Sequence, residues 1–178
     1  MLRINRLQYV FIVRNLIAFL SYLCIVKLFV LLIGFIIINV IIMEPVFYKC
    51  PICGNVVHVM VASGVVPECC GHPMHKLEAN VTDGKVEAHV PKVQCKYLCE
   101  DPRPCFKVTA EIGVVPHPAL KEHHICFIFL ETMCGGEFKF LKPEQEAKVS
   151  FYCKSKPVAV YAYCNLHSLW KANIDCPD

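Results

Sequence analysis

Four cysteines fall close together in the segment YKCPICGNVVHVMVASGVVPECCGHPM. Cys50 and Cys53, followed by a glycine, are typical of a metal-binding knuckle, because glycine lets the backbone turn its amides toward the sulfurs. The adjacent Cys69 and Cys70 complete a set of four thiolates, which suits a tetrahedral iron or zinc ion. This segment therefore predicts a small module that is held together by a metal.

A zinc ribbon that only holds a fold together is the alternative to an iron centre. Iron is favoured because two adjacent cysteines cannot both adopt the relaxed knuckle geometry, and because the rest of the chain points to redox chemistry. His58, His72 and His75 lie nearby, but the thiolate set is complete without them, so we interpret them as surface or packing residues. The runs VVHVMVA and GVVPE between the cysteine pairs are typical of strands.

The composition adds limits to this interpretation. The 178 residues include 13 cysteines, an odd number that cannot pair completely within one chain, and their clustering favours metal ligation in a reducing setting. The net charge of +3 comes without a run of Lys or Arg, so no nucleic-acid patch is expected. From Glu44 onward about 135 residues remain, which is enough to bury a core.

Several cysteines lie outside the cluster, namely Cys24, Cys95, Cys99, Cys105, Cys126, Cys134, Cys153 and Cys176. Cys95, Cys99 and Cys105 could form a third metal site, a disulfide or buried thiols. We favour plain thiols or one disulfide, because no fourth metal ligand is evident near them.

Residues 1–43 are overwhelmingly apolar, and Lys27 is the only charge in the segment 15–43. The uncharged part after Lys27 would span roughly 24 Å as a helix, whereas a bilayer core needs about 30 Å. A hydrophobic N-terminal helix that anchors the protein in a membrane is expected if Lys27 reaches the interface. The alternative is that translation starts at Met43, which would make the protein cytoplasmic. A signal peptide or a buried core helix fits less well, because no cleavage pattern is present and the segment is apolar on all faces.

Five residues in the second half of the chain stand out as candidate metal ligands: His89, His117, His123, Cys164 and His167. The first three are expected on strands and loops, so they would converge only through tertiary folding. Prolines on both sides fix the backbone at His117. Cys164-x-x-His167 has chelate spacing in a short turn. Each histidine alone is more often structural than a ligand, but together they indicate a second metal site.

From about Tyr48 to Ala172 the chain resembles the superoxide reductases, specifically the two-iron form called desulfoferrodoxin. The matching motifs are YKCPICGN, ECCGHPM, TDGKVEAHVP, VPHP with a histidine six residues after its own, FLKP and YCNLHSLWKA. The resemblance implies a mainly β fold, with a desulforedoxin-like module followed by a seven-stranded immunoglobulin-like β-sandwich. The expected parts are a hydrophobic segment (1–43), the module (44–80) and the sandwich (81–178).

The resemblance also implies two iron centres. Carried over by motif, the Fe(Cys)4 ligands are Cys50, Cys53, Cys69 and Cys70, and the ligands of the Fe(His)4(Cys) centre are His89, His117, His123, His167 and Cys164. The family pattern selects His123 over His124, which falls where relatives place an aromatic residue.

The implied activity is the one-electron reduction of superoxide to hydrogen peroxide. An external donor, such as a rubredoxin-like carrier, would return the electron, and a homodimer is possible. The alternatives are a non-catalytic iron-binding electron-transfer protein and a zinc-ribbon interaction module.

One departure from the family pattern concerns catalysis. The family places a Glu-Lys pair before the first histidine, where this chain has Glu87 followed by Ala88. Lys85 would face the same side as Glu87 on an extended segment. We therefore expect Glu87, Lys85 and Cys164 to act in catalysis, with Lys85 or Lys121 supplying the charge that attracts the superoxide anion. Otherwise the solvent and the charge of the iron must suffice.

Overall fold

The computed structural model describes Lys27 and residues 44–98 and 105–176, and the chain divides into two compact units, 1–44 and 45–178. The expected hydrophobic helix and membrane anchor lie outside the described residues, apart from Lys27. No helix among the described residues has the length and hydropathy of a membrane span.

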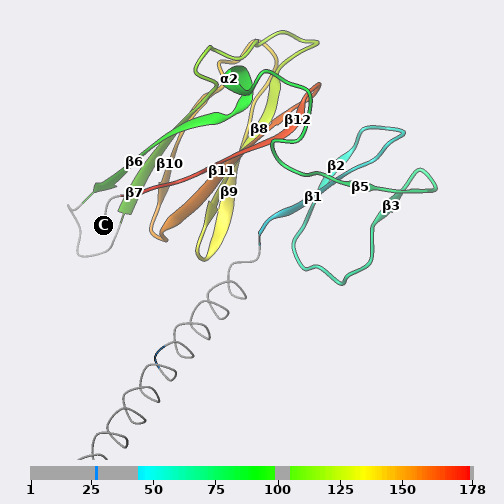
Figure 1. Ribbon diagram of the computed structural model, residues 1–178, viewed down its shortest axis with the longest axis horizontal. Helices are drawn as coiled ribbons and strands as arrows, with labels where there is room; N and C mark the ends of the chain where they lie inside the picture. The colour runs from blue at the N-terminus through cyan, green and yellow to red at the C-terminus, as the bar shows by residue number, and fades with distance from the viewer. Residues whose placement is uncertain (1–26, 28–43, 99–104, 177–178) are drawn as a thin grey trace, which may run out of the picture. The chain divides into compact units, whose positions relative to one another are not determined.

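The second unit begins with a small module built from five short strands (Figure 1). A three-stranded sheet has the order β2-β1-β5, and β3 pairs with β4. The bounds are β1 (Val46–Lys49), β2 (Val56–Val59), β3 (Glu68–Cys69), β4 (His72–Pro73) and β5 (His75–Lys76).

The strand expected in VVHVMVA is confirmed by β2, but the strand expected in GVVPE was wrong except at its last residue, Glu68. Gly64 has a φ of +84°, which ordinary strand geometry does not allow, and Pro67 lacks the amide hydrogen that a ladder needs.

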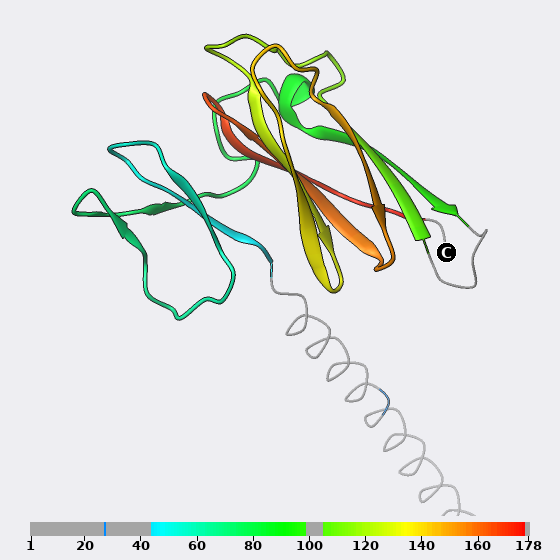
Figure 2. The same ribbon diagram turned by 180° about the vertical axis from the view of Figure 1, so that it is seen from behind.

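Two antiparallel sheets form a β-sandwich in the rest of the unit (Figures 1 and 2). One sheet has the order β10-β7-β6 and the other the order β12-β11-β8-β9. The bounds are β6 (Pro91–Leu98), β7 (Cys105–Ile112), β8 (Ile125–Thr132), β9 (Gly135–Phe140), β10 (Lys148–Cys153), β11 (Pro157–Cys164) and β12 (Ser168–Asn173). A single helical turn, α2 (Val86–His89), precedes β6. The mainly β fold expected from the resemblance is thus confirmed.

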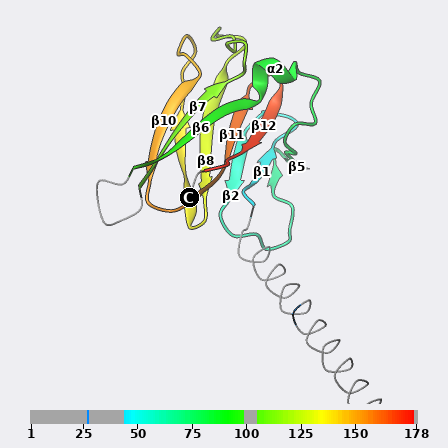
Figure 3. The ribbon, with the colours of Figure 1, turned by 60° about the vertical axis from the view of Figure 1, so that its left-hand side comes forward.

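Strand β11 is buried on both of its faces, which explains its nearly continuous apolar sequence PVAVYAYC. Val160, Ala162 and Cys164 belong to the core between the two sheets. The alternate residues of the strand, including Tyr161 and Tyr163, pack in a second cluster with Phe47 of β1. Figure 3 shows β1 beside the sheet that contains β11. Cys164 therefore lies at the end of a strand that is held rigidly from both sides.

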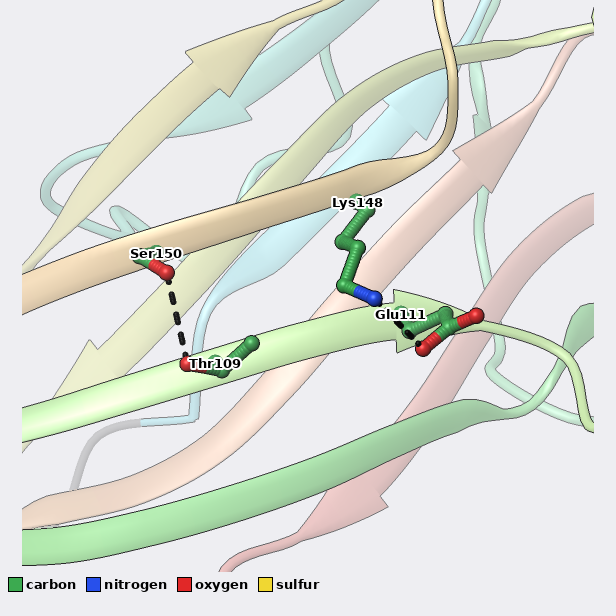
Figure 4. Close-up of polar contacts among 4 residues, drawn as sticks. All are labelled: Thr109, Glu111, Lys148 and Ser150. Carbon is green, nitrogen blue, oxygen red and sulfur yellow. Dashed lines mark hydrogen bonds and ion pairs between the residues drawn. The ribbon is translucent and has the colours of Figure 1, made fainter.

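The outer face of the other sheet is polar, as the β7–β10 pair shows (Figure 4). The hydroxyls of Thr109 and Ser150 lie 3.3 Å apart, and the ammonium of Lys148 lies 3.2 Å from the Glu111 carboxylate. Both pairs are directly opposite in the strand register. These contacts add little stability because they are solvated, but they fit the register in which alternate residues of β7 enter the core.

A disulfide joins Cys95 of β6 to Cys176, which follows the last strand. The bond connects positions 81 residues apart in sequence, with the Cα atoms 5.3 Å apart. We expected Cys95, Cys99 and Cys105 to be plain thiols or to include one disulfide. Cys95 forms the disulfide and Cys105 is a free thiol, whereas Cys99 lies outside the described residues.

Candidate metal centres

The four cysteines of the module converge as expected. The sulfurs of Cys50, Cys53, Cys69 and Cys70 lie within 4.8 Å of one another, with 3.6 Å between Cys53 and Cys69 and 3.9 Å between Cys69 and Cys70. A tetrahedral ion with metal–sulfur bonds of about 2.3 Å separates its sulfurs by about 3.8 Å. The four thiolates therefore fit one tetrahedral iron or zinc ion.

The knuckle around Cys50 holds its sulfur in a field of backbone amides. The N–H groups of Ile52 and Cys53 both point at this sulfur, each at 3.4 Å, and Gly54 makes the turn with a φ of +76°. The Cys53 amide is the largest cause that lowers the pKa of Cys50 to about 6. The neighbouring Cys50 sulfur is the largest cause that raises the pKa of Cys69 to about 12. A cation is needed before all four sulfurs can be ionised together.

His58, His72 and His75 stand apart from this thiolate set, as expected. His72 and His75 are exposed. The His58 ring stacks on Phe47 with 4.9 Å between the ring centroids, and burial lowers its pKa. It is a packing residue.

The second set of candidate ligands comes from five places at one end of the sandwich. His89 ends α2, Cys164 ends β11, and His167 lies in the turn before β12. His117 and His123 lie in the connection between β7 and β8. The expectation of a strand or loop at His89 was wrong, because the chain forms one helical turn there.

The donor atoms of this set face one another across short distances. His89 Nε2 lies 2.9 Å from His167 Nδ1, which in turn lies 3.2 Å from His123 Nε2 and 3.7 Å from the sulfur of Cys164. These four atoms are all within 4.8 Å of one another. The ring of His117 joins them, with its centroid 4.7 Å from that of His89 and 4.6 Å from that of His123.

Backbone carbonyls fix the tautomers of two of the rings. His89 Nδ1 donates to the carbonyl of Lys85 at 2.8 Å, and His117 Nδ1 donates to the carbonyl of Pro118 at 2.7 Å. The opposite nitrogen of each ring then presents a lone pair to the cluster. Nε2 of His117 is buried and has no hydrogen-bond partner within the described structure. An orphaned acceptor of this kind is expected where a metal ion binds.

Burial favours the neutral form of three of these rings, which metal ligation requires. It is the largest cause that lowers the pKa of His89, of His123 and of His117, where the pKa falls to about 4. Burial also raises the pKa of Cys164, an effect that the backbone amides of His167 and Leu166 oppose.

The nitrogen separations match a metal site. Ligands at right angles on an ion with metal–nitrogen bonds of about 2.1 Å lie about 3 Å apart. The observed spacings of 2.9 and 3.2 Å agree with this value. Four imidazoles with one thiolate are donors that suit iron. The residues present therefore fit the iron that the resemblance implies.

Two residues that the sequence did not single out complete the packing. The Trp170 indole stacks on the His89 ring with centroids 4.9 Å apart and donates to the carbonyl of His167 at 2.8 Å. Gly84 leaves room for this stack, because a Cβ there would lie 2.7 Å from Trp170. Neither role follows from spacing alone, since both depend on tertiary contacts.

The structure separates His123 from its neighbour. The His124 ring turns away toward Cys126, with its Nε2 3.8 Å from that sulfur. The preference for His123 over His124 agrees with this geometry.

The expected relation between Lys85 and Glu87 was wrong. Lys85 holds the N-cap position of α2, with no side-chain capping bond, and Glu87 lies in the first helical turn, so the segment is not extended throughout as the expectation required. The amide of Ala88 instead donates to the carbonyl of Lys85 at 3.0 Å, one turn earlier. Lys85, Glu87 and Lys121 are all exposed.

Comparison with known proteins gives a consistent result. The sequence profile described as Desulfoferrodoxin matches residues 81–173, and the one described as Desulfoferrodoxin, N-terminal domain matches residues 44–77. A desulfoferrodoxin homolog of Archaeoglobus fulgidus is 38% identical over 126 residues, which cover 70% of this chain and 94% of the relative. A superoxide reductase of Pyrococcus horikoshii is 35% identical over 107 residues, covering 52% of this chain and 90% of the relative.

The fold has a solved counterpart. The crystal structure of the superoxide reductase from Treponema pallidum superposes with a TM-score of 0.57 at 23% identity, covering 73% of this chain and 99% of that one. This likeness shows a shared fold. With the family profiles, it identifies a two-part protein with a metal-binding module and a β-sandwich. The chain belongs to the desulfoferrodoxin family.

Proposed function

We propose that this protein is a superoxide reductase with two non-haem iron centres, Fe(Cys)4 and Fe(His)4(Cys). The observation that carries the proposal is the convergence of the donor atoms of His89, His123, Cys164 and His167, from segments up to 78 residues apart, with the His117 ring packed against those of His89 and His123. The relative from Pyrococcus horikoshii and the structural counterpart from Treponema pallidum are both superoxide reductases. Ferrous iron bound there would supply the single electron that, together with two protons from the solvent, reduces superoxide to hydrogen peroxide.

The protein side chains would each have a defined task. His89, His117, His123 and His167 would hold the ion as neutral donors, and the buried Cys164 would add a thiolate. The Nδ1–H groups of His89 and His117 each donate a hydrogen bond to a backbone carbonyl, so these two rings cannot rotate freely. Trp170 covers the His89 ring and excludes water from that side.

Two charged residues at the start of α2 complete the proposed catalytic set. We assign Lys85 the role of attracting the superoxide anion. We assign Glu87 the role of the glutamate in the Glu-Lys pair of the family. The exposure of both side chains supports this assignment, because an incoming anion can reach them. Ala88 provides no charge in place of the family's lysine, so electrostatic attraction at this site rests on fewer cations.

Metal analysis and a superoxide-reduction assay on the full chain test the proposal, comparing the parent with Cys164→Ser. We expect two iron ions per parent chain, and loss of the second centre and of superoxide reduction in the variant. Cys134→Ser is the control, because this cysteine is exposed and free. A coloured parent that consumes no superoxide would indicate a non-catalytic electron-transfer protein. A colourless parent with stoichiometric zinc would indicate a structural zinc module.

The remaining features of the organisation are part of the same proposal. We assign residues 44–80 to the Fe(Cys)4 module and 81–178 to an immunoglobulin-like sandwich, with 1–43 as a membrane anchor if that segment is translated. A rubredoxin-like protein is the proposed electron donor, and the functional unit is a homodimer. The mass of the native chain shows whether translation starts at Met1 or at Met43.

A further inference from the structure

The side chain of Asn165 joins the two turns that carry three of the metal ligands. Asn165 directly follows Cys164. Its amide nitrogen donates to the carbonyl of Glu122 at 2.8 Å, and its amide oxygen accepts the N–H of His124 at 3.0 Å. These two peptide groups lie on either side of His123. One side chain therefore brackets the backbone that positions the His123 ring.

Further contacts make this link short and direct. The backbone N–H of Asn165 donates to the carbonyl of His124 at 3.2 Å. The sulfur of Cys164 lies 3.9 Å from the side-chain oxygen of Asn165. Asn165 is half-buried, so its hydrogen bonds are partly shielded from water. The backbone bond would survive truncation of the side chain, whereas the two bonds that bracket His123 would not.

We propose that Asn165 is a positioning residue, which sets the His123 imidazole at the correct distance from the Cys164 sulfur. This inference rests on the proposed function, because it concerns the same iron centre. A metal site needs its ligands held within about 0.5 Å of the productive geometry. Loss of a partner that orients a ligand typically costs 10- to 100-fold in metal affinity or activity.

The chain offers a matched control in Asn80. Its amide nitrogen donates to the carbonyl of Lys171 at 3.1 Å, and its amide oxygen accepts the N–H of the same residue at 2.9 Å. Asn80 thus makes the same kinds of hydrogen bond to backbone groups as Asn165. Its partner, however, lies in strand β12 and not in a turn that carries a metal ligand. Truncation of either asparagine removes one donor and one acceptor.

The experiment compares Asn165→Ala and Asn80→Ala in the iron-loaded full chain. The readouts are the rate of iron release from the oxidised protein to a chelator, followed separately at the thiolate-to-iron absorption bands of the two ferric centres, and the reduction potential of the second centre. We expect Asn165→Ala to release iron from the second centre about tenfold faster, with a shifted potential and an unchanged Fe(Cys)4 centre. Asn80→Ala should leave both centres at the parent values.

A second variant, Asn165→Asp, keeps the acceptor for the His124 amide but loses the donor to Glu122, so it should give an intermediate release rate. It also serves as the test if the alanine variant does not fold. If the folded Asn165 variants release iron at the parent rate and keep the parent potential, the role of Asn165 is refuted. The proposed function is not affected by that result. A parent that takes up iron only in the four-cysteine centre would overturn the proposed function, and the inference with it.

Discussion

Nε2 of His89 lies 2.9 Å from Nδ1 of His167, although 78 residues separate the two histidines. Because Nδ1 of His89 donates to the Lys85 carbonyl, its Nε2 carries a lone pair. A second lone pair at this distance would repel it, so the arrangement requires a proton or a metal ion between the rings. The buried Nε2 of His117, which has no partner among the described residues, points to a metal ion.

Burial of His117 makes the stability of the metal-free protein depend on pH. The pKa of His117 is about 4 in the folded chain, against 6.5 for an unperturbed histidine. Between these values the unfolded chain binds a proton that the folded chain does not, so the free energy of unfolding falls as the pH falls from 6.5 to 4. The loss from this group is at most about 3 kcal/mol.

Thermal unfolding of metal-free parent and His117→Gln at pH 7.5 and 4.5 measures this contribution. From pH 7.5 to pH 4.5, the unfolding temperature of His117→Gln should fall less than that of the parent. Equal losses in both proteins would show that His117 is not the group responsible.

Gly84 should tolerate no side chain. A Cβ at this position would lie 2.7 Å from Cζ2 of Trp170, 3.2 Å from Cβ of His167 and 3.3 Å from Cε1 of His89. Gly84→Ala should therefore displace the tryptophan or a ligand, with a loss of about 1–3 kcal/mol in unfolding free energy. Iron in the second centre should bind about tenfold more weakly.

Chelator competition and thermal unfolding measure these two effects, with Asp83→Ala as the control because Asp83 is the exposed neighbour. Iron retention in Gly84→Ala equal to that in the control would refute the tight packing.

The Cys95–Cys176 disulfide should stabilise the sandwich substantially, because it closes a long loop. In the chain-entropy account, a separation of 81 residues corresponds to about 4.5 kcal/mol. Cys176→Ser should lower the unfolding free energy by about this amount, and a reductant should lower that of the parent equally. Denaturant unfolding gives the measurement, and Cys134→Ser is the control. A Cys176→Ser variant as stable as the parent would contradict the prediction.

The two metal sites differ in how far the sequence predicts them. The four thiolates of the module follow from local spacing, because Cys50-x-x-Cys53 and Cys69-Cys70 each form one turn. The second site joins residues from distant segments, so the sequence offers them only as separate candidates, and the family resemblance assigns His89, His117 and Cys164 to one iron centre. The helical turn at His89, the pairing of Cys95 with Cys176, and the roles of Gly84 and Asn165 depend on tertiary contacts that periodicity does not encode.

The position of Ala88 leads to a prediction about the capture of superoxide. The Ala88 amide donates to the carbonyl of Lys85, so these residues lie one turn apart and share a side of α2. A unit charge about 8 Å from an incoming anion in water contributes about 0.5 kcal/mol, or roughly a twofold change in rate. Lys85→Ala should therefore slow superoxide reduction about twofold at low ionic strength, and Ala88→Lys should accelerate it by a similar factor.

Both changes should disappear near 1 M salt, where the screening length is about 3 Å. Stopped-flow or pulse-radiolysis rates as a function of ionic strength provide the measurement. Lys96→Ala is the matched control, because Lys96 is an exposed lysine of β6 that pairs with Lys107, away from α2. If Lys85→Ala keeps the rate and salt dependence of this control, Lys85 does not attract the substrate, and the charge of the iron itself must suffice.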